Sequence, residues 1–244
     1  MTNEATIEKM QRMKLHGMAR AFQNILSNPM QFTADEMAAY LIDSEWDERY
    51  NRKLLGLLKS ARFRYPVSFE SLDYRPDRNL DKNQMQRLLN CDWLRKKENI
   101  IITGATGVGK SYVASALGNL VCKQGFKAIY FNCLKLFSRL KFARAEGSYE
   151  KEINLIQKKD LLVLDDFGLD ILDGPSRLSL LEIIEDRQGR KSTIITSQLP
   201  IKNWFEAIGD PTIADAVCDR IIHSAVKIDL KGDSMRKIYP KDSG

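Results

Sequence analysis

The residues best suited to chemistry lie in a short stretch that is rich in glycine and ends in a lysine and a serine. This stretch, 104–111, reads GATGVGKS and matches the pattern G-x-x-x-x-G-K-[ST]. It directly follows an apolar run of strand length and opens a helical stretch that reaches Cys122. Glycines let main-chain N–H groups turn inward around phosphate oxygens, and a helix N-terminus adds partial positive charge. The pattern therefore predicts a phosphate-binding loop for a nucleoside triphosphate.

In such a loop the lysine and the serine have separate tasks. Lys110 is expected to reach the β- and γ-phosphates as a catalytic cation, and Ser111 is expected to hold Mg²⁺. We therefore predict ATP and Mg²⁺ as cofactors, with a glycine-rich turn that binds no ligand as the alternative. The residues predicted to contact the nucleotide here are Gly104, Ala105, Thr106, Gly107, Val108, Gly109, Lys110, Ser111 and Tyr112.

A second chemical pattern is a pair of acids at the end of an apolar run. The run LLVL at 161–164 is followed by Asp165 and Asp166, and Asp165 lies 55 positions after Lys110. Neighbouring like charges at the end of a buried strand cost free energy unless a cation or water compensates them. Beside a phosphate-binding loop, Asp165 is expected to support the Mg²⁺ shell, and Asp166 to orient the attacking water as catalytic base. The alternative is a solvated turn after a strand.

Two later positions carry polar groups that could serve the same site. The run at 193–196 (TIIT) is followed by Ser197 and Gln198, at the sheet edge where nucleotides bind in open α/β folds. Either residue could sense the γ-phosphate, and simple strand capping is the alternative. Arg220 stands in an otherwise apolar helical stretch. It could pair with Asp219, or it could project into a neighbouring subunit's active site as an arginine finger.

The elements that position these residues follow from the apolar pattern. Strand-length runs occur at 99–103, 128–132, 161–164, 193–196 and 225–229, mostly separated by helical stretches. Continuous Val, Ile and Leu runs suit strands that are covered on both faces, so we predict an α/β fold with a parallel sheet and helices on both sides. We predict a helical N-terminal domain at 1–62 for partner docking or self-association, a linker segment at 63–98, and an ATPase core at 99–244.

Composition limits the classes of protein that remain. The 244 residues are 43% apolar, and no run approaches the length that a membrane span requires, so we expect no membrane partner and a cytoplasmic protein. The four cysteines lie far apart without metal-ligand spacing, which favours reduced, buried thiols. A net charge of +6 favours a polyanionic partner such as nucleic acid.

Taken together, these motifs resemble the IstB/DnaC-like members of the AAA+ ATPases, and the likeness is greatest to the IstB ATPases that help bacterial insertion sequences transpose. The resemblance covers nearly the whole chain. The matching stretches are MKLHGMA at 13–19, WLRKKEN at 93–99, LDDFG at 164–168, ITSQ at 195–198, DRIIH at 219–223 and GDSMR at 232–236. The DDFG and DRIIH combination is far more specific than the phosphate-binding loop alone.

The resemblance implies several roles. Asp166 replaces the glutamate that is common in AAA+ proteins, and Gln198 falls where many relatives carry the sensor asparagine. Arg220 matches the finger that acts in trans, which implies that each active site is completed between subunits. The segment 69–74 resembles a linker that lines the adenine pocket, although packing on the core explains it equally well. Arg236 matches a tail position whose role stays open, with a second phosphate sensor as one option.

Basic residues between the second and third apolar runs suggest DNA contact. Lys135, Arg139 and either Lys141 or Arg144 can share one helix surface, and such a surface suits phosphates with little sequence information. In initiator and helicase-loader relatives the corresponding segment lines a DNA channel, so the resemblance implies that role here. Most charged helix faces are merely solvated, which is the alternative. A second cluster and two linker arginines could reach DNA or a neighbouring subunit: Arg187, Arg190 and Lys191, and Arg62 and Arg64.

The resulting hypothesis is an ATPase that assembles with ATP into a homo-oligomer on double-stranded DNA. By resemblance, it would aid transposition by selecting the target site and recruiting a transposase. A replicative helicase loader of the DnaC kind is the nearest alternative. A small-molecule kinase and an adaptor that never hydrolyses its nucleotide are further alternatives.

Overall fold

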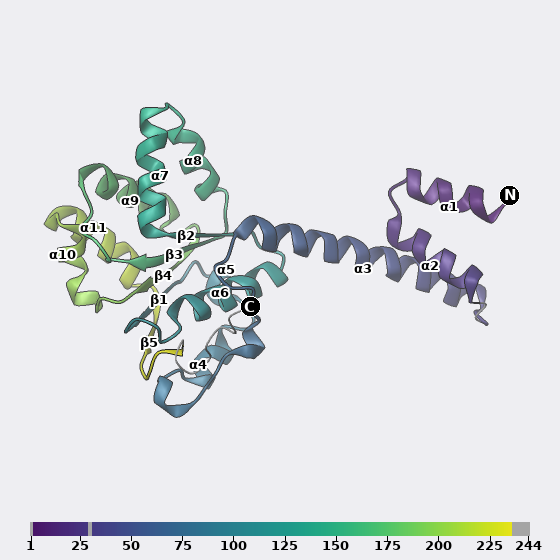
Figure 1. Ribbon diagram of the computed structural model, residues 1–244, viewed down its shortest axis with the longest axis horizontal. Helices are drawn as coiled ribbons and strands as arrows, with labels where there is room; N and C mark the ends of the chain where they lie inside the picture. The colour runs from purple at the N-terminus through teal and green to yellow at the C-terminus, as the bar shows by residue number, and fades with distance from the viewer. Residues whose placement is uncertain (1, 29–30, 236–244) are drawn as a thin grey trace, which may run out of the picture. The chain divides into compact units, whose positions relative to one another are not determined.

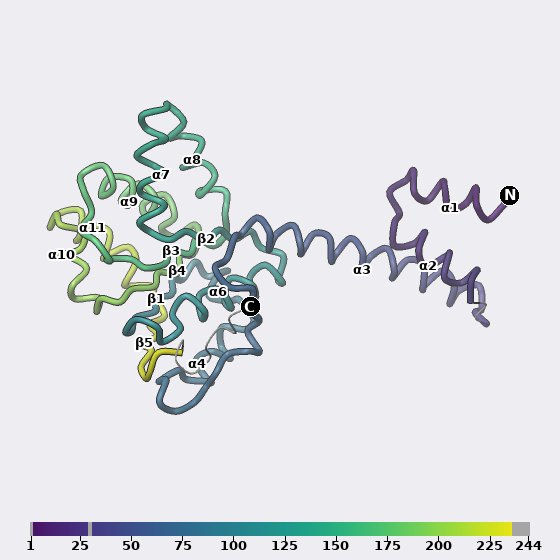
Figure 2. Tube along the Cα trace, viewed as in Figure 1, coloured from purple at the N-terminus to yellow at the C-terminus, as the bar shows by residue number. Residues whose placement is uncertain are grey.

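The structure is a computed structural model that describes residues 2–28 and 31–235. The chain divides into two compact units, Met1–Gly56 and Leu57–Gly244. The course of the chain through both units can be followed in Figure 1 and Figure 2. Arg236, whose role the sequence leaves open, lies outside the described residues.

The first unit contains the helices α1 (Asn3–Arg12) and α2 (His16–Ser27) and most of α3 (Ala34–Ala61), which continues into the second unit. A capping box opens α3, because Thr33 N donates to Glu36 Oε2 at 2.8 Å and Glu36 N donates to Thr33 Oγ1 at 3.4 Å. This exchange satisfies main-chain groups that the first helical turn leaves without partners. Thr33 is therefore the residue that precedes the first turn of α3.

A buried glutamate joins α2 to α3. Glu45 is 6% exposed, and its Oε2 accepts hydrogen bonds from Gly17 N at 2.8 Å and Met18 N at 3.2 Å. The carboxylate thereby caps the first turn of α2 and meets its partial positive charge. A Cβ on Gly17 would lie 2.2 Å from Ser44 O, so this close approach of the two helices requires glycine. The buried carboxylate of Glu45 and the small residue Gly17 therefore hold α2 against α3, and an ion pair between Arg20 and Glu48 joins the same two helices.

The second unit is built on a five-stranded sheet in which every described pairing is parallel. The strand order is β2-β3-β4-β1-β5. Each strand includes one of the apolar runs predicted from the sequence, so the parallel α/β fold is confirmed. The strands are β1 (Asn99–Gly104), β2 (Ala128–Asn132), β3 (Leu161–Phe167), β4 (Ser192–Ser197) and β5 (Ala225–Leu230).

Helices cover both faces of this sheet, with α7, α8 and α9 on one side and α6 on the other (Figure 1). Both faces of the sheet are buried. Ile100 and Ile102 point to one face, and Ile101 points to the other, where it joins the core under α7 and α9. All three side chains are at most 1% exposed. The helices are α4 (Lys82–Arg87), α5 (Asp92–Arg95), α6 (Lys110–Lys123), α7 (Cys133–Ala145), α8 (Tyr149–Gln157), α9 (Gly174–Arg187), α10 (Trp204–Ile208) and α11 (Pro211–Ile222), with short 3-10 turns at Phe69–Ser71, Pro76–Arg78 and Ile201–Asn203.

All four cysteines are buried and unpaired, as the sequence predicts. Burial raises their pKa, and the value is about 11 for Cys91, Cys122 and Cys218. These thiols therefore serve as small core residues. Among the described residues, no helix has the length and apolar character needed to cross a membrane.

Candidate nucleotide-binding site

The glycine-rich loop joins the end of β1 to the start of α6. Gly104 ends the strand, Lys110 begins the helix, and Gly104, Gly107 and Gly109 all have positive φ. A Cβ on Gly104 would lie 2.3 Å from Leu230 O, and a Cβ on Gly109 would lie 2.7 Å from Arg78 Nη2. Both the backbone conformation and the space around the loop therefore exclude larger residues. The result is a strand, loop and helix arrangement suited to holding phosphate groups.

Arg78 supports this loop from behind, which the sequence gave no means to predict. Its side chain is 3% exposed, and it donates to Val108 O at 2.9 Å and to Asp73 O at 2.7 Å. Burial is the main reason that the pKa of Arg78 is lowered. Arg78 therefore links the main chain of the phosphate-binding loop to the segment before β1.

Lys110 and Gln198 both contact the loop. Lys110 is 5% exposed, and its Nζ donates to Ala105 O at 2.9 Å, so the ammonium group lies within the turn of the loop. Thr106 Oγ1 donates to Gln198 Oε1 at 2.6 Å. This contact places the side chain after β4 beside the residues predicted to hold the phosphates.

Ser197 has a different environment from Gln198. It is fully buried, its Oγ donates to Phe167 O at 2.8 Å, and the same oxygen accepts a hydrogen bond from Leu199 N at 3.0 Å. These contacts match the strand-capping alternative. Of the two predicted sensor residues, only Gln198 is brought to the loop.

Asp165 joins the acidic strand to the phosphate-binding loop. It is fully buried at the end of β3, and its Oδ1 accepts hydrogen bonds from Ser111 Oγ at 2.8 Å and Thr196 Oγ1 at 2.5 Å. Its Oδ2 accepts a hydrogen bond from Tyr130 Oη. Burial, followed by this hydrogen bond, raises the pKa of the Tyr130 hydroxyl. Ser111 and Asp165, both expected near Mg²⁺, are in direct contact, while Thr196 and Tyr130 were not anticipated because both are ordinary strand residues.

Asp166 has a backbone conformation that turns its carboxylate away from the strand. Its φ is 60°, in the left-handed region, and the pairing between β3 and β4 shifts register between Leu164 and Phe167. Its main-chain N donates to Thr196 Oγ1 at 3.0 Å, and its carboxylate accepts from Asn132 Nδ2 at 3.1 Å. The two neighbouring acids thus differ, because Asp165 faces the core while the Asp166 side chain keeps 18% of its surface exposed.

Arg64 contacts both acids. Its Nη1 lies 3.4 Å from Asp165 Oδ2 and 3.3 Å from Asp166 Oδ2. The sequence analysis considered Arg64 only as a linker residue that might reach DNA or a neighbouring subunit. The structure instead places this cation at the acidic pair.

Arg220 lies at the opposite end of β1 from the phosphate-binding loop. The next residue, Ile221, accepts a hydrogen bond at its main-chain oxygen from Asn99 Nδ2 at 3.3 Å. Asn99 is the first residue of β1, whereas the phosphate-binding loop begins at the last residue of that strand. A strand of this length spans about 16 Å, so Arg220 is too far away to serve the loop of its own chain. Its Nη2 pairs with Glu185 at 2.9 Å, and not with Asp219, which contacts His223 instead. Arg220 also lines a pocket of about 410 Å³ with Lys96, Lys97 and Lys191.

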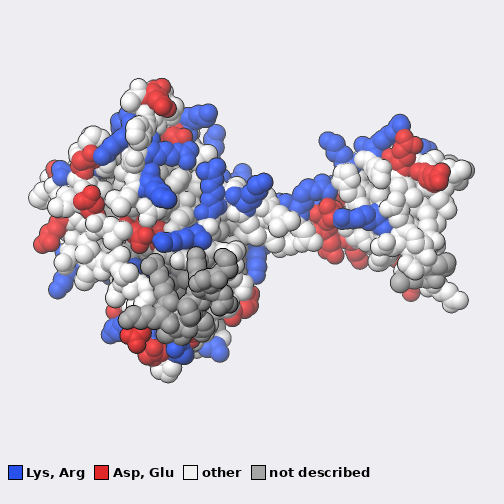
Figure 3. Space-filling view, viewed as in Figure 1, with Lys and Arg blue, Asp and Glu red and all other residues white. Residues whose placement is uncertain are grey.

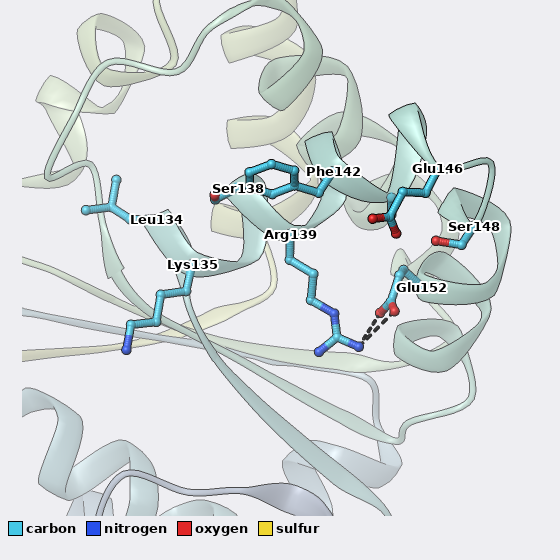
Figure 4. Close-up of a pocket in the computed structure, with 9 residues that line it drawn as sticks. Leu134, Lys135, Ser138, Arg139, Phe142, Glu146, Ser148 and Glu152 are labelled. Carbon is cyan, nitrogen blue, oxygen red and sulfur yellow. Dashed lines mark hydrogen bonds and ion pairs between the residues drawn. The ribbon is translucent and has the colours of Figure 1, made fainter.

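The basic residues of α7 do not form one continuous face. Lys135 and Arg139 line a shared pocket of about 620 Å³ between α7 and α8 (Figure 4), and Arg139 pairs there with Glu152 at 2.6 Å. Lys141 pairs with Asp173, and Arg144 lies over the Tyr149 ring at 3.7 Å. Of the four predicted DNA contacts on this helix, the structure brings only Lys135 and Arg139 together.

Arg187 contradicts the expectation that it contacts DNA. It is 2% exposed, and its guanidinium group donates to the main-chain oxygens of Ile156, Lys159, Asp160 and Ser192 and to Thr193 Oγ1. Burial lowers the pKa of Arg187 to about 10. A side chain used in this way cannot reach a phosphate backbone, so Arg187 is a structural residue.

The other two members of that cluster are more accessible. Arg190 is largely exposed and pairs with Asp186 at 3.7 Å, and Lys191 pairs with Asp160 at 2.6 Å. Arg190 can exchange its partner for phosphate at small cost, because exposed ion pairs are weak, whereas the pair of Lys191 with Asp160 is half-buried. They stay predicted DNA contacts.

Two further segments contact the phosphate-binding loop or the start of α6. Tyr112 Oη lies 3.1 Å from Ser71 Oγ, next to Phe69 and Leu72, which are buried. This burial fits the core-packing alternative for the segment 69–74 and leaves its adenine-side role a prediction. From the other end of the chain, Met235 N donates to Gly107 O at 3.0 Å. The tail stretch that contains the GDSM residues therefore contacts the phosphate-binding loop.

These features define the class of protein. A parallel sheet in the order β2-β3-β4-β1-β5, a phosphate-binding loop between β1 and α6, and a buried aspartate at the end of β3 are the marks of an ATP-binding P-loop domain of the AAA+ type. The chain belongs to the family of IstB-like ATP binding proteins, whose family model matches residues 8–243. The resemblance seen in the sequence is thereby confirmed.

Relatives and a solved structure agree with this assignment. The chain is 43% identical over 234 residues to the insertion sequence ATP-binding protein y4pL of Sinorhizobium fredii, covering 95% of this chain and 96% of that protein. It is 38% identical over 203 residues to the ATP-binding protein of insertion sequence IS1162 of Pseudomonas fluorescens, covering 82% and 88%. The crystal structure of the DnaC helicase loader matches with a TM-score of 0.55 and 21% identity, covering 68% of this chain and 98% of that one. At that identity the last match speaks to the fold alone.

Proposed function

We propose that this protein is the ATPase of an insertion sequence, which binds Mg·ATP, assembles as a homo-oligomer on duplex DNA, and aids transposition by selecting the target site and recruiting the transposase. The observation that carries the ATPase part is the 2.8 Å hydrogen bond from Ser111 Oγ to Asp165 Oδ1, because it joins the phosphate-binding loop to the acidic strand. The insertion sequence part rests on the names of relatives at 43% and 38% identity.

The donor set around Ser111 suits Mg²⁺. A hydroxyl and a carboxylate oxygen are hard ligands, and Mg²⁺ in nucleotide sites takes one or two such ligands and completes its shell with phosphates and water. Within residues 2–28 and 31–235 there is no group of three His, Cys, Asp or Glu side chains that could hold a metal ion by itself. This composition fits an ion that arrives with the nucleotide. When bound, Mg²⁺ would neutralise phosphate charge next to Lys110.

The different exposure of the two acids supports different roles for them. Asp165 is fully buried and its oxygens are occupied by donors, so its task is to hold Ser111 and the ion. Asp166 keeps exposed surface and accepts a hydrogen bond from Asn132, so its carboxylate can take a proton from an attacking water. Gln198, bonded to Thr106, is positioned to orient groups near the terminal phosphate.

Completion of the site by a second copy explains the position of Arg220. The residue cannot reach the loop of its own chain across the length of β1, yet it lines a basic pocket beside Lys96, Lys97 and Lys191. A neighbouring subunit's triphosphate would meet an arginine finger there. Release from Glu185 would precede that contact, at a small cost because the carboxylate is 48% exposed.

DNA binding is proposed for the basic surface of the second unit. Lys and Arg side chains gather over α7 and α8 on the face drawn in Figure 3. Lys135 and Arg139 are the central pair, and contacts of this kind read phosphate charge rather than sequence. Arg190 and Lys191 form a second accessible group.

The test combines phosphate release with DNA binding in ATP, in ADP and without nucleotide. Lys110→Ala should abolish nucleotide binding, and Asp166→Asn should keep ATP-dependent DNA binding while turnover falls at least about 100-fold, the usual contribution of a general base. Asp170→Asn, an exposed acid in the loop after β3, is the matched control and should retain turnover. Equal DNA binding in all three nucleotide conditions would rule out a switch driven by ATP.

The alternative with a specific observation behind it is a helicase loader, since the DnaC fold matches. Such a protein would bind a replicative helicase and prefer single strands. Capture assays with the transposase of the same element and with the host helicase, run side by side, separate the two. Retention of the helicase alone would favour the loader.

A further inference from the structure

Arg64 is the residue that the proposed reaction leaves without a role. It follows the end of α3 by three positions, and its Nη1 lies 3.4 Å and 3.3 Å from the Oδ2 atoms of Asp165 and Asp166. One cation thus bridges two adjacent carboxylates. It supplies one of the two positive charges that a divalent ion on Ser111 and Asp165 would bring.

The acidic pair needs such a cation for a physical reason. Asp165 is fully buried, and a buried carboxylate next to a second one is costly unless opposite charge compensates it. Ser111, Thr196 and Tyr130 donate hydrogen bonds to Asp165, but these are neutral groups. Arg64 supplies full positive charge that the hydroxyl donors cannot.

We propose that Arg64 is a built-in counter-cation that holds the acidic pair in the metal-free protein and leaves it when Mg·ATP binds, so that Arg64 sets the Mg²⁺ concentration the site requires. This inference rests on the proposed ATPase function and adds a residue that competes with the metal. Both contacts are longer than a good charge-assisted hydrogen bond, and the side chain is 39% exposed. An exchangeable contact has these properties.

The neighbours of Arg64 make the exchange a side-chain movement. Phe63 packs so closely over α6 that a Cβ on Gly118 would lie 2.2 Å from its ring. On the other side, the ring of Tyr65 lies 5.8 Å from that of Tyr112, between centroids. Because Phe63 and Tyr65 both pack on α6, the side chain of Arg64 can rotate into solvent while its backbone stays in place.

The test is the Mg²⁺ dependence of ATP binding, followed with a fluorescent ATP analogue on the full chain. In Arg64→Gln the Mg²⁺ concentration for half-maximal binding should fall roughly fivefold, the strength of a partly exposed ion pair. With EDTA the same variant should bind the analogue more weakly than wild type, because the uncompensated acids repel the triphosphate. General damage to the site would weaken binding in both conditions, so the opposite signs are diagnostic.

Two variants complete the design. Arg62→Gln removes the same charge from an exposed position two residues earlier and should leave the Mg²⁺ requirement unchanged. Arg64→Lys keeps the charge without the planar fork, and should fall between wild type and Arg64→Gln, which also covers the case in which the glutamine variant does not fold.

Three results would overturn the inference. An unchanged Mg²⁺ requirement in Arg64→Gln would mean that the arginine does not compete with the metal. A higher requirement would mean that Arg64 binds the phosphates directly. If wild-type protein binds no ATP analogue at any Mg²⁺ concentration, the proposed function itself fails, and this outcome is distinct from normal binding with no effect of the substitution.

Discussion

Arg187 allows a direct test of whether the sequence pattern or the buried environment decides a residue's role. The substitution Arg187→Met keeps an unbranched side chain of similar length in the core and removes every donor. In wild type these donors satisfy four main-chain carbonyl groups and one hydroxyl. We therefore expect lost stability with DNA affinity preserved.

The magnitude follows from the hydrogen bonds lost. Each hydrogen bond lost at a buried carbonyl costs about 1 kcal/mol, so four would cost about 4 kcal/mol. Ile156 O and Asp160 O each keep a main-chain donor, Lys159 N and Ser192 N, and this, together with methionine's packing and entering water, lowers the total to about 3 kcal/mol. This loss is within the stability of an ordinary domain, so the variant should still fold. Arg190→Met removes an exposed pair with Asp186 and should change stability by less than about 0.5 kcal/mol.

The assay is equilibrium urea unfolding of the full chain, monitored by circular dichroism, combined with DNA binding in conditions where both variants are folded. Arg187→Met should show a lower unfolding midpoint and wild-type DNA affinity. If Arg187→Met is as stable as wild type and binds DNA several-fold more weakly, the buried carbonyl contacts do not describe the protein and the sequence-based assignment was right.

Three further outcomes follow from the same contacts. Tyr130→Phe should lower the stability of the metal-free protein by about 1–2 kcal/mol, because Asp165 loses a donor in the core, and thermal melting would show no loss if the contact is absent. Lys110→Ala and Arg220→Ala should each be inactive alone but release phosphate when mixed, whereas inactivity of the mixture argues against completion in trans. Stability should fall as pH rises from 9 to about 11, because the unfolded thiols ionise near 9 while the folded ones stay protonated, and a flat urea midpoint across this range would contradict it. The thiols concerned are Cys91, Cys122 and Cys218.

The fold and the centre of the site were predictable because their determinants are local. Runs such as LLVL at 161–164 define strands by composition, and GATGVGKS at 104–111 defines a loop by glycines that no other residue can replace. The sequence analysis expected Ser111 and Asp165 near the same ion, and parallel strands that end at a common edge bring their side chains into contact.

The residues that were missed are those whose partners come from distant parts of the chain. Thr196 and Tyr130 look like ordinary strand residues, and only the alignment of β2, β3 and β4 brings their hydroxyls to Asp165. Arg78 reaches across 30 positions to Val108 O. Arg187 was misassigned because its sequence neighbours Arg190 and Lys191 are more accessible cations, whereas its own position at the end of α9 faces carbonyl groups.

The positions of two arginines separate the steps of the proposed cycle. Arg64 lies on the acidic pair of its own chain, so its exchange with Mg·ATP is intramolecular and does not depend on protein concentration. Arg220 lies at the far end of β1, a strand that spans about 16 Å, so any effect it has on hydrolysis requires a second copy and must grow with concentration. In the proposed cycle, nucleotide loading and turnover would therefore be governed by different cations. An isolated chain should load Mg·ATP and hydrolyse it slowly, which is the behaviour that an ATP-driven assembly requires.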